Sequence, residues 1–118
     1  MKVNILGTEY TIEKRKHTDD NSFEKKGIDG YCDRFSRLIV ILDLDSSKKW
    51  DDELENSKRE CEKSTIRHEI VHAFLFESGL AENSGGADEG WATNEEIVDW
   101  IANQTPKITK AFEEAGAL

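Results

Sequence analysis

Two histidines four positions apart, with a glutamate beside the first, are the part of this sequence whose types and spacing point most directly to chemistry. The segment His68-Glu69-Ile70-Val71-His72 has the pattern H-E-x-x-H. On a helix, side chains four positions apart lie on the same face, so both imidazole rings can reach one metal ion. Zn²⁺ takes imidazole nitrogen at about 2.0–2.1 Å, and the glutamate can then act on water beside the ion. The pattern predicts His68 and His72 as zinc ligands and Glu69 as a general base.

The alternative interpretation is a pair of helix-surface histidines beside a solvated glutamate. The residues around the pattern argue against it, because Ile66, Ala73 and Phe74 are apolar and indicate a buried helix face. Two buried histidines and a buried glutamate are costly without a metal or hydrogen-bond partners. The flanking residues therefore favour a metal site over a coincidence of helix packing.

A catalytic zinc ion takes three protein ligands, so a third residue is required. The segment Asn94-Glu95-Glu96-Ile97-Val98-Asp99 follows H-E-x-x-H and begins a second expected helix. With this segment the chain resembles the gluzincin metallopeptidases, the thermolysin-like class, which pair H-E-x-x-H with a later helix bearing N-E-x-x-x-D. The resemblance implies Glu95 as the third ligand, Asp99 as the carboxylate that orients His68, and Asn94 as a residue that holds the other histidine.

The residues alone leave a second candidate for the third ligand. Glu96 lies three positions before Asp99 and borders Ile97 and Trp100, which form the expected apolar face of this helix with Ile101. A helix rotated by one position would present Glu96 to the metal in place of Glu95. Two glutamates at a helix start are also favoured simply by the helix dipole.

The chain is also similar to small phage- and prophage-encoded zinc-peptidase-like proteins, over about residues 65–106. This resemblance implies a Zn²⁺ cofactor, a peptide or protein substrate held along an edge strand within residues 31–42, and hydrolysis of peptide bonds. The distal histidine of the larger gluzincins has no counterpart after Asp99. The sequence offers four other candidates for stabilising an oxyanion, namely Tyr10, Tyr31, His17 and Arg67. The alternative function is a catalytically weak or inactive zinc-binding domain of phage type with a regulatory or interaction role.

The elements that must position these residues are expected to form one α+β domain over residues 1–118. The expected elements are strands around 3–5, 10–12, 31–33 and 38–42, helices over 57–78 and 94–104, a loop over 83–90, and a last short helix over 107–115. A small N-terminal antiparallel or mixed sheet should pack on the H-E-x-x-H helix and on the helix after it. We expect the second half of the first helix to be buried on most sides, and Pro106 to end or redirect the second helix.

Composition limits the class of protein further. The 118 residues carry 25 acidic and 16 basic side chains, a net charge of −9, which argues against binding to nucleic acid or to an anionic membrane. No apolar run approaches the ~20 residues of a membrane span, and the first residues do not read as a signal peptide. Cys32 and Cys61 form no C-x-x-C pair and are expected to be reduced thiols. The sequence predicts a cytoplasmic protein, with Trp50, Trp91 and Trp100 as core or interface anchors.

Overall fold

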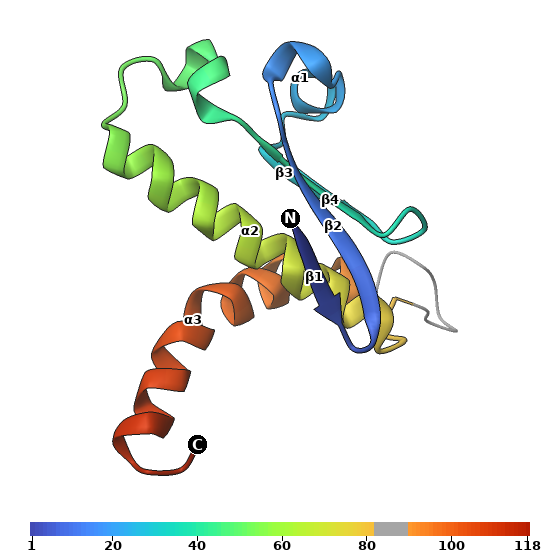
Figure 1. The fold of residues 1–118 in the computed structure, drawn as a ribbon, viewed down its shortest axis with the longest axis vertical. Helices are drawn as coiled ribbons and strands as arrows, with labels where there is room; N and C mark the ends of the chain where they lie inside the picture. The colour runs from blue at the N-terminus through green and yellow to red at the C-terminus, as the bar shows by residue number, and fades with distance from the viewer. Residues whose placement is uncertain (82–89) are drawn as a thin grey trace.

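A computed structural model of the chain describes residues 1–81 and 90–118. Within these residues, four strands form one mixed sheet, with the long helices α2 and α3 beside it (Figure 1). The bounds of the main elements are β1 Lys2–Ile5, β2 Thr8–Arg15, α1 Ser22–Lys26, β3 Gly30–Asp33, β4 Leu38–Leu42, α2 Glu55–Glu77 and α3 Glu95–Glu114. This architecture confirms the α+β class expected from the sequence.

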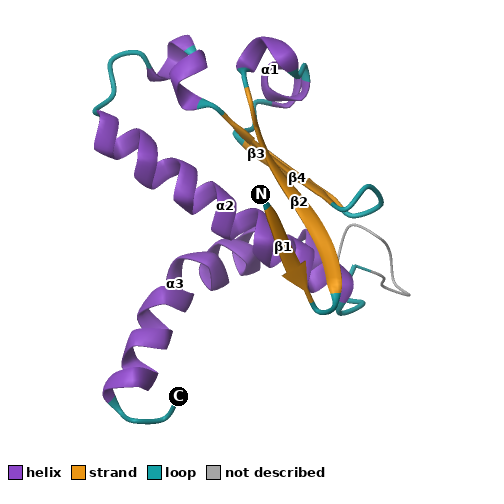
Figure 2. Cartoon of the chain, in the orientation of Figure 1, coloured by secondary structure: helices purple, strands orange, loops and turns teal. Residues whose placement is uncertain are grey.

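The sheet has the strand order β1-β2-β4-β3, which leaves β1 and β3 at its edges. The pairs β1–β2 and β3–β4 are antiparallel, and the central pair β2–β4 is parallel. Figure 2 shows the strands gathered on one side of α2, with α3 packed on the same helix. The expected hairpin of the first two strands is present, and β3 is an edge strand that also contacts α2.

The apolar run of β4 supplies both parts of the core. Ile39 and Ile41 pack with Tyr10 and with Ala73 of α2 in the first buried cluster. The alternate residues of β4, led by Val40, belong to a second cluster. Side chains point to opposite faces of a strand at successive positions, so a continuous apolar run indicates burial on both faces.

Helix α2 is less buried than its sequence predicts. In its second half only Glu69, His72 and Ala73 are buried, whereas Phe74 is exposed. The expectation of burial on most sides is therefore confirmed only in part, because most other positions of this half are partly buried. The sheet, α3 and the short 3-10 helix Trp91–Thr93 all contact α2.

Helix α3 continues through Pro106, so the prediction that the helix ends at this proline, with a separate helix after it, is wrong. The alternative of a redirected helix is not contradicted, because the ribbon of α3 changes direction along its length (Figure 1). Proline removes one N–H donor and so leaves the carbonyl oxygen four positions earlier, that of Ala102, without its usual helical partner. Sharp bends in helices commonly occur at proline. The C-terminal part of α3 extends away from the rest of the chain (Figure 1).

The buried face of α3 also differs from the expected one. Val98 and Ala102 are buried, whereas Trp100 is 60% exposed and Trp91, before the helix, is exposed as well. Neither of these two tryptophans is a core anchor, and Trp50 is only partly buried. Small side chains at Val98 and Ala102 let α3 approach α2 closely, which the larger Trp100 would prevent.

Most of the loop expected over 83–90 lies outside the described residues. Gly79, with a backbone φ of +88°, follows the end of α2 as expected for a helix C-cap. In the described ranges, no helix combines the length and the apolar character that a membrane span requires.

Candidate metal centre

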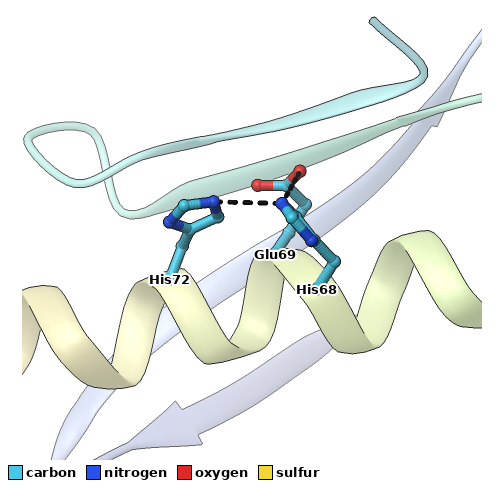
Figure 3. A group of neighbouring side chains, drawn as sticks. All are labelled: His68, Glu69 and His72. Atoms are coloured by element: carbon cyan, nitrogen blue, oxygen red, sulfur yellow. Dashed lines mark hydrogen bonds and ion pairs between the residues drawn. The ribbon is translucent and has the colours of Figure 1, made fainter. Parts of the chain in front are cut away.

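His68, Glu69 and His72 come together on one side of α2, where Figure 3 shows the three side chains close to one another. Each offers a ligand atom within 4.8 Å of the others, so the group could hold a metal ion. Helical spacing produces this arrangement, because His68 and His72 are one turn apart. The two rings meet edge to face, with their centroids 4.7 Å apart.

Hydrogen bonds at the Nδ1 atoms fix the orientation of the His68 and His72 rings. His68 Nδ1 lies 2.7 Å from Asp99 Oδ1, and His72 Nδ1 lies 2.6 Å from the carbonyl oxygen of Ala92. A carboxylate and a carbonyl only accept hydrogen bonds, so each Nδ1 carries the proton. The Nε2 atoms of the two rings face each other, 3.1 Å apart, and are the atoms that remain available to a metal ion.

The carboxylate of Glu95 lies close to both of these Nε2 atoms. Its Oε2 lies 2.9 Å from His68 Nε2, and its Oε1 lies 3.1 Å from His72 Nε2. Two imidazole nitrogens and a carboxylate at this separation repel one another unless a proton or a metal cation lies between them. Ligands at 2.0–2.1 Å from a tetrahedral ion lie about 3.3 Å apart, which is close to these separations. The three side chains therefore fit a small divalent metal ion.

The packing of α3 decides which glutamate faces the histidines. Glu95, Val98, Asp99 and Ala102 follow the i, i+3, i+4, i+7 spacing of one helix face, and Val98 and Ala102 are buried. Glu95 and Asp99 therefore face His68, while Glu96 is exposed and, in the described part of the chain, contacts neither histidine. The sequence leaves open whether Glu95 or Glu96 faces the histidines, and in the structure it is Glu95.

Asn94 has a different position from the one that the resemblance implies. Its side chain caps α3, where Oδ1 accepts a hydrogen bond from the Ile97 backbone N–H at 2.9 Å. The backbone carbonyl of Ala92, in the short 3-10 helix Trp91–Thr93, holds His72 instead. A contact with a backbone carbonyl does not depend on which residue stands at position 92, so it cannot be predicted from the sequence.

Glu69 lies between α2 and the edge strand β3 and is only 6% exposed. Burial raises its pKa to about 7, and the nearby Glu95 adds to this effect, while His68 opposes it. The carboxylate is 4.0 Å from His68 Nε2, farther than Glu95 is. A buried carboxyl with a pKa near neutrality is suited to taking up and releasing protons. Glu69 therefore lies beside the convergent atoms, but farther from His68 Nε2 than Glu95 does.

This burial predicts how the stability of the metal-free protein depends on pH. The folded pKa of about 7 exceeds the ordinary value of 4.5, so the folded state binds more protons between these values and loses stability as the pH rises through this window. Glu69→Gln removes the charge, so in chelator the stability of the variant relative to wild type should rise by roughly 2.5 kcal/mol between pH 5 and pH 8. Urea unfolding at both pH values measures this difference. Glu60→Gln, at an exposed position of the same helix, should show no such gain, and parallel pH profiles for wild type and Glu69→Gln would refute the prediction.

The contact between His68 and Asp99 carries a second prediction. Asp99→Asn keeps the size of the side chain but removes the charge that orients the ring, so metal affinity should fall by roughly 10–100-fold. Competition with a coloured zinc chelator measures the change. Asp51→Asn, on an exposed turn, should leave affinity unchanged. Equal affinities for wild type and Asp99→Asn would show that Asp99 has no part in the centre.

A cleft of about 530 Å³ opens over the convergent atoms, between α2, β3 and the start of α3. Gly30 of β3 makes this close approach possible, because a Cβ atom there would lie 2.6 Å from Thr65 Cγ2 on α2. The same hypothetical atom would lie 3.6 Å from Glu69 Cγ, so the strand passes directly over the buried carboxylate.

The four candidate oxyanion donors are not gathered at this cleft. Tyr10 is fully buried and donates to Glu77 at 2.7 Å, and Arg67 lines a separate groove between α2 and α3. His17 is not among the residues that line the cleft. Tyr31 does line it, but its hydroxyl donates to Asp20 at 2.6 Å, and burial raises the pKa of Tyr31 to about 12.

Comparison with known proteins gives the chain no relatives: no family model, no curated protein and no solved structure matches it.

Proposed function

We propose that this chain is a small zinc-dependent peptidase in which His68, His72 and Glu95 hold the metal and Glu69 is the general base. The observation that carries the proposal is the convergence of two imidazole Nε2 atoms and the Glu95 carboxylate, with separations of 2.9–3.1 Å. Zinc fits because two imidazoles and one carboxylate are a ligand set of catalytic zinc sites and leave a further position open.

The metal would supply Lewis-acid chemistry, polarising a substrate carbonyl and making water acidic near neutral pH. The remaining steps belong to side chains of this chain. Glu69 takes the proton of the attacking water and returns it to the leaving amine. Asp99 and the Ala92 carbonyl keep His68 and His72 in orientation through their Nδ1 atoms.

Substrate binding is assigned to the free edge of β3. Within residues 1–81 and 90–118 this strand pairs with β4 on one side only, so its other edge would offer backbone donors and acceptors to an extended peptide. At Gly30 the face of this strand packs against α2 close to Glu69. A peptide paired there would pass its backbone over the convergent histidines.

A second function is supported by the engaged tyrosines. Because the Tyr31 hydroxyl is held by Asp20 and Tyr10 is buried, neither is presented as a donor to a developing oxyanion. This favours a zinc-binding domain that recognises a protein without cleaving it. Glu69 argues for the peptidase, because ligation does not require this carboxyl and its burial opposes stability near neutral pH.

Metal content and peptide cleavage together test the proposal. Mass spectrometry of purified protein should find about one zinc per chain in the wild type and in His17→Ala, a histidine outside the cleft, and none in His72→Ala. A peptide library should be cleaved by the wild type, with cleavage abolished by chelator and restored by Zn²⁺. Zinc without cleavage would favour the binding domain, and a folded wild type with no zinc would refute both functions.

A further inference from the structure

A second groove, of about 520 Å³, lies between α2 and α3 and shares no lining residue with the cleft over the histidines. Its α2 wall is one helix face of about two turns, because the lining residues recur at i, i+3, i+4, i+7 and i+8. These residues are Arg67, Ile70, Val71, Phe74 and Leu75. A groove between two helices with a mainly apolar wall has the shape that receives a third helix.

Arg67 gives this groove a cationic group with an unused donor. Its Nε atom is buried, and within residues 1–81 and 90–118 nothing accepts a hydrogen bond from it. A buried donor without an acceptor lowers stability, and a carboxylate would both accept the hydrogen bond and balance the guanidinium charge. Charge complementarity therefore requires an occupant that carries an acidic side chain beside its apolar face.

The chain itself carries such a helix in the last part of α3, residues 107–114, which we call the C-terminal arm. It extends away from the rest of the molecule (Figure 1), and it has about two turns, as the α2 wall of the groove does. Ile108 and Phe112 lie one turn apart on one face, and Phe112 is 49% exposed. Glu113 and Glu114 follow directly. The arm thus combines an exposed aromatic ring with two carboxylates.

We infer that two copies of this chain pair by placing the C-terminal arm of each copy in the groove between α2 and α3 of the other. Helix α3 supplies the arm and also one wall of the groove, through Thr109 and Glu113 among others. A twofold axis beside α3 therefore fills both grooves at once, as an isologous dimer requires. Phe112 of each copy packs on the apolar wall of the other, and the carboxylates at positions 113 and 114 meet Arg67. Neither a metal ion nor catalysis enters this pairing.

The net charge of −9 on each copy opposes association at long range. Repulsion between charges far apart on the two surfaces is largely screened beyond about 8 Å at 0.15 M salt, whereas apolar contact and a close ion pair are affected much less. We therefore expect the dimer at this salt concentration.

Sedimentation velocity between about 1 and 300 µM protein tests the pairing. The mass of the wild type should rise from that of one chain toward that of two. Phe112→Ser should weaken association roughly 10-fold or more, because it removes the ring that fills the groove. Phe35→Ser, which changes a more exposed ring at the turn between β3 and β4, should leave it unchanged. A wild type that stays monomeric over the whole range would overturn the inference.

Charge reversal tests the contact between the arm and the groove, and it also controls for folding. Arg67→Glu in one protein, and Glu113→Arg with Glu114→Arg in a second, should each abolish association, because like charges then meet in both grooves. An equal mixture of the two proteins should associate as the wild type does, since each groove then meets an arm of opposite charge. Restoration in the mixture shows that both proteins are folded. A mixture that stays monomeric although both proteins keep the melting temperature of the wild type, or a dimer that Phe112→Ser leaves intact, would overturn the placement of the arm.

Discussion

Glu69→Gln is expected to lower peptide hydrolysis by roughly 10²–10⁴-fold while one zinc per chain stays bound. The amide has nearly the shape of the carboxyl but cannot take a proton from water, so the attacking group is no longer activated. The proposed zinc ligands are unchanged in this variant, because Glu69 is 4.0 Å from His68 Nε2 whereas Glu95 contacts both histidines. Cleavage of the best library peptide, followed beside zinc content, measures both quantities.

The control for this result is Glu60→Gln, which changes an exposed glutamate of α2 that pairs with Lys63. It should leave hydrolysis and zinc content unchanged. Loss of zinc in Glu69→Gln would place this residue among the ligands. Full activity with zinc retained would remove it from the mechanism and leave the cleavage unexplained by this site.

Zinc is expected to stabilise the wild type by about 4 kcal/mol at a free concentration a thousand times its dissociation constant. For a domain of this size, the melting temperature should rise by roughly 10–20 °C. Glu95→Ala removes the carboxylate that bridges the two Nε2 atoms, so most of this increase should disappear. Thermal unfolding with chelator and with added Zn²⁺ gives the difference for each protein.

Glu96→Ala is the matched control, because it removes the same group one position away. Its zinc-dependent increase should equal that of the wild type, since Glu96 is exposed and contacts neither histidine. A larger loss in Glu96→Ala than in Glu95→Ala would mean that α3 is rotated relative to the structure described here. Equal melting temperatures with and without zinc in the wild type would contradict a metal centre of any composition.

Local spacing accounts for the parts of the site that the sequence predicts. The α-helix has 3.6 residues per turn, so His68 and His72 must share one face and Glu95 and Asp99 must share another. The apolar run over 38–42 predicts a buried strand for the same local reason. These inferences depend only on residues a few positions apart, which is why they need no knowledge of the whole fold.

Which face of α3 meets α2 is a tertiary property, and here the sequence prediction was wrong. Ile97, Trp100 and Ile101 suggested the buried face, but Val98 and Ala102 occupy it and Trp100 is exposed. Large apolar residues do not define the contact when small ones allow two helices to pack more closely. Apolar periodicity alone would have assigned this helix the wrong rotation.

The sequence by itself therefore determined the α+β class, the paired histidines with their neighbouring glutamate, and a second helix with a glutamate and an aspartate on one face. Only the tertiary structure decided that Glu95 and not Glu96 meets both imidazoles, that a backbone carbonyl at Ala92 orients His72, and that Phe76 lines the cleft. The physical reason is distance along the chain. Side-chain spacing within a helix is fixed by its geometry, whereas contacts between α2, α3 and β3 depend on how all three pack against one core.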